Sequence, residues 1–176
     1  MNERLLRPGR LQGFTLIELM IVVAILGILA STAIPMLASQ QLRSKTTEAK
    51  TNLGAIRVVE EANFGETGEY IAANAEPAVI PGSVAVDFDD AGSDFAALGW
   101  SPEGRVFFSY AVVISADSSG YTADAAADLD ENGVVQIWGY KKAAGNGSFV
   151  NGGLGCDHTT LTPEILGSCI TSGTVY

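Results

Sequence analysis

The chain is poor in the residue types from which most catalytic and metal sites are built. Its 176 residues include one histidine and only two cysteines. No nucleophile, base and acid stand at a recognisable catalytic spacing, and no glycine-rich phosphate-binding loop follows a predicted strand. Internal repeats and low-complexity segments are absent from the sequence as well. These absences argue against an enzyme and leave structural and binding roles open.

Positive charge is also scarce. The sequence has 20 acidic and 10 basic residues, a formal net charge of −10. From Glu60 onward there are 17 acids and only three bases. Non-specific nucleic-acid binding needs a positive surface, so we expect no nucleic-acid partner. The acidity instead favours solubility and repulsion between assembled particles.

A short basic segment opens the chain and ends at Gly13. Residues 1–13 contain three arginines and one acid. Basic residues ahead of a hydrophobic span hold the N-terminus on the cytoplasmic side of a membrane. A secretory signal peptide would be cut at small residues after its apolar stretch, and no such site is evident. The candidate junction, Gly13–Phe14, precedes the apolar stretch, so residues 1–13 are predicted to be a cleaved leader peptide.

The longest hydrophobic run follows at once. Phe14 to Pro35 is a stretch of 22 residues with one charge, Glu18. At about 1.5 Å per residue, a helix of this length spans about 33 Å, which is enough to cross a hydrocarbon core. Residues 14–38 are therefore predicted to form a transmembrane and assembly helix. Gly27 and Pro35 are its helix-weakening points.

The carboxylate inside this run needs an explanation, because a charge at the centre of a bilayer costs about 3 kcal/mol on insertion scales. The segment GFTLIE at residues 13–18 resembles the class III signal of type IV prepilins and pseudopilins. This resemblance implies a membrane-embedded prepilin peptidase that cuts after Gly13, and methylation of the new Phe14 amine. It also implies that Glu18 pairs with the N-terminal ammonium of a neighbouring subunit. Opposite charges attract strongly in a low-dielectric fibre core, where either charge alone is heavily penalised.

Alternatives stay open both for the role of this helix and for the local structure at Gly27–Pro35. An ordinary single-pass anchor with a chance glutamate would show the same apolar run. In the resembled family, the region that corresponds to Gly27–Pro35 can stretch or partly melt when the fibre forms. A proline kink in a continuous helix explains the same residues.

From Ser39 to about Phe64 the apolar pattern becomes one-sided, which predicts an amphipathic helix. The apolar positions, at spacings of three, four and seven, are Leu42, Ala49, Leu53, Ile56 and Val59. We expect residues 39–64 to continue the membrane helix and to pack a globular head on this stripe. The segment between residues 43 and 53 is also similar to type IVa pilins of the myxobacterial and related deltaproteobacterial group.

The remaining residues are predicted to form an α+β head. Residues 65–104 are rich in glycine and proline and are predicted to be a long irregular connection, which corresponds to the αβ-loop of the resembled family. The strands expected after it are Arg105–Ile114, Gly120–Ala127 and Val134–Tyr140. The resemblance implies the type IV pilin fold: one long N-terminal helix packed on a small antiparallel β-sheet. Residues 105–176 would supply that sheet and a disulfide-bounded C-terminal loop.

Cys156 and Cys169 are the only cysteines. Disulfides persist outside the cytoplasm, where the predicted topology puts the head. A bridge across a loop of about 15 residues contributes about 3 kcal/mol in the chain-entropy model. In the resembled family such a bridge bounds the exposed D-region. Metal binding by Cys156, His158 and Cys169 is the alternative, but no fourth ligand is evident.

Residues 128–133, with the sequence DLDENG, fit the first half of an EF-hand-like calcium loop. The oxygens of Asp128, Asp130 and Asn132 would converge on a weakly bound Ca²⁺. The twelfth position, where a bidentate glutamate belongs, is Gly139, so a plain hairpin turn is the simpler interpretation. Because major type II secretion pseudopilins bind calcium in the head, this loop also bears on the choice of subfamily.

The patterns together predict a structural subunit of a type IV pilus fibre that polymerises through its N-terminal helix and serves adhesion and twitching motility. The alternative is a pseudopilin of a type II secretion or DNA-uptake machine. Expected partners are further copies in a helical homopolymer, the inner membrane, prepilin peptidase and the pilus assembly platform. No cofactor is expected beyond the calcium candidate. Before assembly we expect a single-pass inner-membrane protein with a cytoplasmic N-terminus and a periplasmic head; afterwards, an extracellular pilus.

Overall fold

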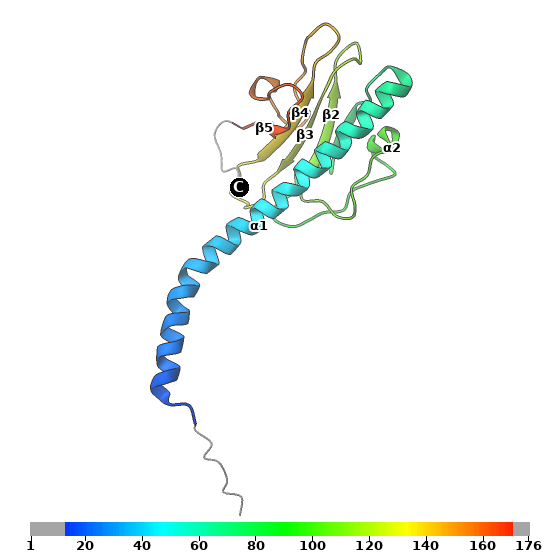
Figure 1. Cartoon of the computed structure of the whole chain (residues 1–176). Coiled ribbons are helices and arrows are strands. Elements are labelled where there is room, and N and C mark those ends of the chain that lie inside the picture. The colour runs from blue at the N-terminus through cyan, green and yellow to red at the C-terminus, as the bar shows by residue number, and fades with distance from the viewer. Residues whose placement is uncertain (1–12, 171–176) are drawn as a thin grey trace, which may run out of the picture. The chain divides into compact units, whose positions relative to one another are not determined.

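The computed structural model describes residues 13–170, which fall into two compact units that divide between Ser39 and Gln40. One long helix begins in the first unit and ends in the second, and every strand lies in the second (Figure 1). The elements in chain order are α1 (Leu16–Thr67), β1 (Ala73–Glu76), α2 (Phe95–Leu98), β2 (Ser109–Ile114), β3 (Tyr121–Ala127), β4 (Gln136–Lys142), the 3₁₀ turn η1 (His158–Thr160) and β5 (Gly167–Ser168).

The part of α1 in the first unit is apolar on all sides. Every residue from 14 to 38 is exposed. The helix is long and apolar enough to cross a membrane, by length and composition. It continues without interruption through Gly27 and Pro35. A helix that is hydrophobic all round needs an apolar environment, which this unit does not provide for itself.

The second unit buries one stripe of α1. Ala49, Leu53 and Ile56 are completely buried, as their helical spacing predicts. Thr46 and Glu60 extend the same stripe by one turn at each end and are also buried. The helical expectation for residues 39–64 is therefore confirmed, and the helix continues three residues further. The pattern did not reveal that polar residues end the buried stripe.

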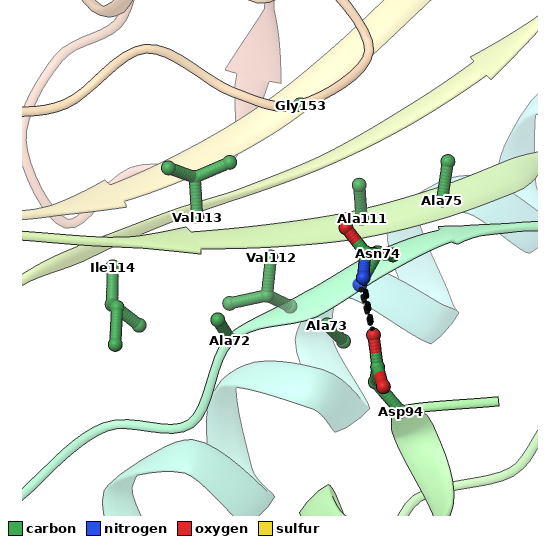
Figure 2. A pocket seen from close by; sticks show the side chains of 10 residues that line it. All are labelled: Ala72, Ala73, Asn74, Ala75, Asp94, Ala111, Val112, Val113, Ile114 and Gly153. Atoms are coloured by element: carbon green, nitrogen blue, oxygen red, sulfur yellow. Dashed lines mark hydrogen bonds between the residues drawn. The ribbon is translucent and has the colours of Figure 1, made fainter.

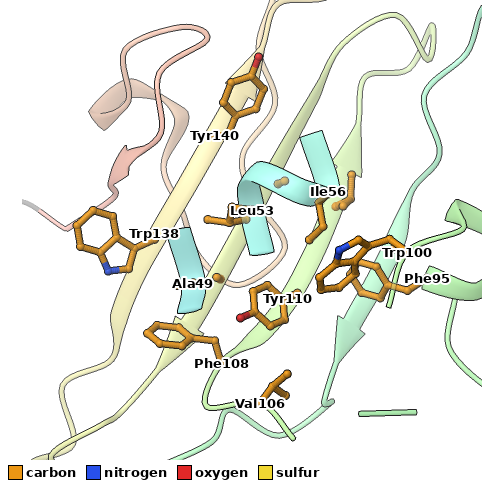
Figure 3. Close-up of a cluster of buried hydrophobic side chains, with 14 of the residues drawn as sticks. Ala49, Leu53, Ile56, Phe95, Trp100, Val106, Phe108, Tyr110, Trp138 and Tyr140 are labelled. Atoms are coloured by element: carbon orange, nitrogen blue, oxygen red, sulfur yellow. The ribbon is translucent and has the colours of Figure 1, made fainter. Parts of the chain in front are cut away.

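The strands form one antiparallel sheet in the order β1-β2-β3-β4-β5. Val112 of β2 pairs with Ala123 of β3, and Ala125 of β3 pairs with Trp138 of β4. Alternate residues of these strands face α1, because side chains alternate across a strand. Figure 3 shows their large side chains around Leu53 and Ile56 of the helix. The buried residues that β2, β3 and β4 contribute to this core are Tyr110, Val112, Tyr121, Ala123, Ala125, Ala127, Trp138 and Tyr140.

The predicted strand boundaries needed correction. The strand predicted from Arg105 begins only at Ser109, and Val106 instead forms an isolated bridge with Val86. The next predicted strand agrees to within one residue, and β4 lies two residues later than expected. β1, α2 and β5 were not expected. They have only two to four residues each, which is too short for a hydrophobic period to show.

The connection between residues 65 and 104 is held to the core by aromatic side chains. Phe95 of α2 contacts Trp100 and Phe88 edge-on, with ring centroids 5.3 and 5.5 Å apart. Trp100 in turn contacts Tyr110 of β2 at 5.5 Å. Such pairs add to the burial of each ring, so this connection is packed on the core rather than loose over it.

The face of the sheet away from α1 is also covered. All seven residues of β3 are buried, so both of its faces are packed. The Thr122 hydroxyl donates to the Val150 carbonyl at 2.6 Å. Asp124 accepts hydrogen bonds from the backbone N–H groups of Gly153, Leu154 and Cys156. The C-terminal segment therefore forms a third layer over the sheet.

Candidate functional site

The first turn of α1 is built around Glu18. Thr15 precedes the helix, and its hydroxyl accepts a hydrogen bond from the Glu18 N–H at 3.2 Å. The Glu18 carboxylate reaches back to the Thr15 N–H at 2.9 Å and to its hydroxyl at 2.8 Å. This reciprocal arrangement is a capping box, which satisfies donors that the first helical turn leaves free. Sequence reasoning missed Thr15, although the T-x-x-E spacing was visible.

The capping box places the carboxylate beside the predicted cleavage junction. Gly13, Phe14 and Thr15 precede the helix and are fully open to solvent. Phe14 is 76% exposed, and nothing lies within 4 Å of a side chain built on Gly13. Most of the predicted leader, residues 1–12, lies outside the described residues. An amine created at Phe14 would be one residue away from the group that Glu18 already binds.

The apolar residues that follow have no partner within the described chain. Leu16, Met20 and Ile28 are 80%, 64% and 70% exposed. A contiguous exposed apolar surface of this kind marks contact with lipid or with other protein. The first unit is therefore an exposed apolar helix with one charged side chain, Glu18, in its first turn.

Gly27 and Pro35 both lie inside the continuous helix. No atom lies within 4 Å of a Cβ built on Gly27. Proline has no N–H, so Pro35 leaves the Ser31 carbonyl without its usual helical donor. In the same stretch, the hydroxyls of Ser31 and Thr32 donate to the carbonyls of Ile28 and Leu29 in the preceding turn. Local stretching of this region on assembly stays a prediction.

Cys156 and Cys169 form a disulfide, which confirms the predicted bridge and excludes the alternative of a Cys-and-His metal site. Their Cα atoms lie 5.1 Å apart, within the range usual for disulfides. The bridge packs directly on Gly139 of β4: a Cβ built there would lie 2.7 and 2.8 Å from the two sulfur atoms. A glycine at this position is what lets the covalent clamp reach the sheet.

The calcium candidate forms a hydrogen-bonded turn. The two carboxylate oxygens of Asp128 accept from the N–H groups of Asn132 and Gly133 at 3.2 and 3.0 Å. The Asn132 amide donates to Asp130 at 2.8 Å, and its oxygen accepts from Val134 at 2.7 Å. Within residues 13–170, no group of three or more acidic, His or Cys side chains is arranged to hold a metal ion. Calcium binding by this loop stays a prediction, and the turn explains its sequence without one.

Two buried acids were missed at the sequence level. Glu60 is completely buried; one of its oxygens accepts from the Ile71 N–H at 3.1 Å and the other has no partner among the described residues. Burial, opposed by that hydrogen bond, raises the pKa of Glu60 to about 7. Asp124 is also buried, and burial outweighs its backbone hydrogen bonds and raises its pKa to about 6. No sequence motif marks either residue, because their burial depends on distant segments.

Comparison with known proteins identifies the N-terminal part of the chain. Residues 10–34 match the family model of the prokaryotic N-terminal methylation motif. The chain is 57% identical to the type IV major pilin protein PilA of Myxococcus xanthus over 61 residues, which is 35% of this chain and 28% of that protein. It is 46% identical over 66 residues to a fimbrial protein of Pseudomonas aeruginosa, covering 38% of this chain and 42% of that one.

The matches are confined to part of each protein. A type IV major fimbrial protein FimA of Dichelobacter nodosus is 50% identical over 50 residues, 28% of this chain and 32% of its own length. The chain thus spans less than half the length of these curated relatives. No solved structure matches it significantly. Together with the long helix, the five-stranded sheet and the disulfide, these findings confirm the resemblance to type IV pilins and the α+β pilin fold.

Proposed function

We propose that the protein is a structural subunit of a type IV pilus. The observation that carries this proposal is the exposed apolar part of α1 with a single carboxylate in its first turn, inside the segment that matches the methylation motif. Relatives named as major pilin and fimbrial proteins match about a third of this chain. Apolar helices bundled in a fibre core would cover the surface that the chain leaves open.

Glu18 gives the bundle a register in this proposal. Cleavage after Gly13 by a prepilin peptidase creates a positively charged amine on Phe14. Apolar contacts between helices are non-directional, whereas a buried carboxylate and ammonium must meet to avoid a large desolvation penalty. In the isolated chain the Glu18 carboxylate is held by Thr15. On assembly, the Glu18 carboxylate therefore binds the amine of a neighbouring copy, either in place of its Thr15 partners or in addition to them.

Before assembly the same helix spans the inner membrane, with the basic leader on the cytoplasmic side. The head with its disulfide then lies in the periplasm, an oxidising compartment. The assembly platform extracts the helix into the fibre, and adhesion and twitching motility follow from the fibre and its motors. The pseudopilin alternative has no supporting observation here, since the loop that suggested it forms a hydrogen-bonded turn.

Shearing surface filaments from the native cells, followed by intact-mass and peptide mass spectrometry, tests the proposal. We expect an abundant mature chain that starts at methylated Phe14 and retains the Cys156–Cys169 bridge. Cleaved protein held only in the cell envelope, with none in the sheared fraction, would overturn the pilus assignment in favour of a pseudopilin. An uncleaved chain would leave a simple membrane anchor.

A further inference from the structure

Three of the seven lysine and arginine residues of the second unit form one row on α1. Arg43, Lys50 and Arg57 are seven residues apart, so they lie on one side of the helix along about 21 Å. Lys50 lies over the ring of Trp138 at 4.1 Å and Arg57 over that of Tyr140 at 5.3 Å. Both rings belong to β4, so this basic row follows the seam between α1 and β4.

The cations of the basic row are not paired with acids within the described part of the chain. Within residues 13–170, none of its three cations forms an ion pair, whereas Lys142 binds Glu61 and Glu164 at 3.1 and 3.4 Å. All three row residues are exposed at the surface. The aromatic rings hold the charged groups of Lys50 and Arg57 in place without neutralising their charge.

The complementary charge lies on the opposite flank of α1. Residues 65–104 contain eight acids and no lysine or arginine. Four of them make up an acidic lobe beside β1: Glu76, Asp89, Asp90 and Asp94. Glu76 accepts from the Asp89 N–H at 3.2 Å. No member of the lobe forms an ion pair within the described part of the chain.

Neighbouring polar residues hydrogen-bond to the acidic lobe, and a groove opens within it. Asp94 accepts two hydrogen bonds from Asn74 of β1, at 3.0 and 2.7 Å, and Figure 2 shows these two side chains facing each other beside the edge strand. The Ser101 hydroxyl donates to Asp90. A groove of about 270 Å³ lies between Glu76 and Asp94, and its remaining lining is Asn74, Ala75, Gly92 and Ser93. Side-chain amines and guanidinium groups fit a groove of this size and charge.

The basic row and the acidic lobe cannot meet within one molecule. The row follows β4, the lobe lies at β1, and two strands separate them in the sheet (Figure 1). At about 4.8 Å per strand, β4 and β1 are about 14 Å apart across the sheet. Two different surfaces that complement each other build an open chain of copies rather than a closed pair.

We propose that the acidic lobe of one copy docks on the basic row of the next copy, as a contact between neighbouring globular heads along the filament surface. This inference rests on the proposed function, because it needs assembled copies. Complementary charge mainly sets orientation and rejects wrong pairings, which the non-directional apolar helices do not do. The apolar helices hold the copies together, and the charged flanks fix how neighbouring heads turn toward each other.

Zero-length carbodiimide cross-linking of sheared wild-type filaments tests the contact without any substitution. Lys50 is the only amine in the basic row, so we expect an amide between Lys50 and Glu76, Asp89, Asp90 or Asp94 in the band of cross-linked dimers. A dimer band whose cross-links all lie elsewhere would overturn the proposal. If no filaments are recovered from wild-type cells, the proposed function itself fails, and that failure is distinguishable from a filament that lacks this cross-link.

Charge reversal provides a second, independent test. Lys50→Glu with Arg57→Glu is expected to lower the sheared filament yield by at least about fivefold, because like charges then face each other. Adding Asp89→Lys with Asp90→Lys should restore the yield. Arg105→Glu is the matched control, since Arg105 is exposed and forms its ion pair with Asp87 beside the lobe. Equal yields from the reversed and control variants, or no restoration in a variant whose head stays protease-resistant, would overturn the proposal.

Discussion

Between residues 16 and 38, α1 is apolar on every side and exposed, whereas from residue 40 onward it is apolar on one stripe and that stripe is buried. The two halves of the helix therefore differ in where their apolar side chains find contacts. The second half finds its apolar partners in the same chain, on β2, β3 and β4. The first half has none there, and its apolar surface must be covered by lipid or by other copies.

The acids of the two halves differ in the same way. Glu18 sits exposed in the first turn, held by Thr15, and has carboxylate oxygens within reach of an incoming group. Glu60 is enclosed by the head and keeps one oxygen without a partner. Under the proposed function, the acid serves assembly in the first case. In the second case it makes the stability of the head depend on pH.

The largest expected effect comes from removing the charge of Glu18. Glu18→Gln and Glu18→Val should both leave membrane insertion and cleavage intact and should reduce sheared filaments to below about a tenth of the wild-type yield, because an unpaired ammonium in the fibre core is heavily penalised. Immunoblots of membrane and sheared fractions measure both properties.

Thr15→Val separates capping from pairing. This variant loses the capping hydroxyl but keeps the Glu18 carboxylate, so we expect filaments at near wild-type yield. If Thr15→Val abolished filaments while Glu18→Gln retained them, the role of Glu18 would be helix capping and the pairing hypothesis would be wrong.

The next largest effect concerns the covalent clamp of the head. Cys156→Ser with Cys169→Ser should lower the free energy of unfolding of the head by about 2–4 kcal/mol. Guanidinium unfolding of the full-length protein in detergent, followed by tryptophan fluorescence, measures this because both tryptophans lie in the head core. An unchanged midpoint would show that the C-terminal layer is held by hydrogen bonds such as those to Asp124 alone.

Gly139→Ala tests the packing of the disulfide on β4 by adding a single methyl group. The added methyl group would meet both sulfur atoms of the disulfide, and overpacking of this kind costs about 1–3 kcal/mol. Gly54→Ala is the matched control: it lies on α1 with no atom within 4 Å of the new group and should stabilise the helix by about 1 kcal/mol. Equal effects of the two substitutions on the unfolding midpoint would contradict the packing of the bridge on β4.

The smallest effect is the pH dependence that Glu60 introduces. Its pKa rises from an ordinary carboxyl value to about 7 in the folded head, so the folded state binds a proton more tightly than the unfolded state. Between about pH 7 and pH 4.5 the head should therefore become more stable as the pH falls, by about 1–2 kcal/mol from this group. Glu60→Gln should flatten that slope.

Unfolding midpoints at pH 8 and pH 5.5 for wild type and Glu60→Gln measure the difference. Asp124 contributes in the same direction, since burial raises its pKa as well, so part of the slope remains in the variant. A wild-type slope of the opposite sign, or an identical slope in Glu60→Gln, would show that the Glu60 carboxyl titrates at an ordinary pKa.

The sequence predicted the elements whose signal is local and repeated. The apolar run from Phe14, the buried stripe through Leu53 and the three inner strands all have a hydrophobic period over many residues. β1 and β5 have four and two residues, and their strand conformation depends on the neighbours they pair with. Thr15 was predictable from its spacing to Glu18 and was overlooked.

Most features of the N-terminal segment could therefore be predicted from the sequence, because a membrane or a fibre core requires apolar side chains at consecutive positions. Tertiary structure alone decided the rest. It buried both faces of β3, seated the disulfide on Gly139, enclosed Glu60 and put the basic row and the acidic lobe on opposite flanks. Each of these depends on segments tens of residues apart meeting in space, and no local pattern specifies which segments will meet.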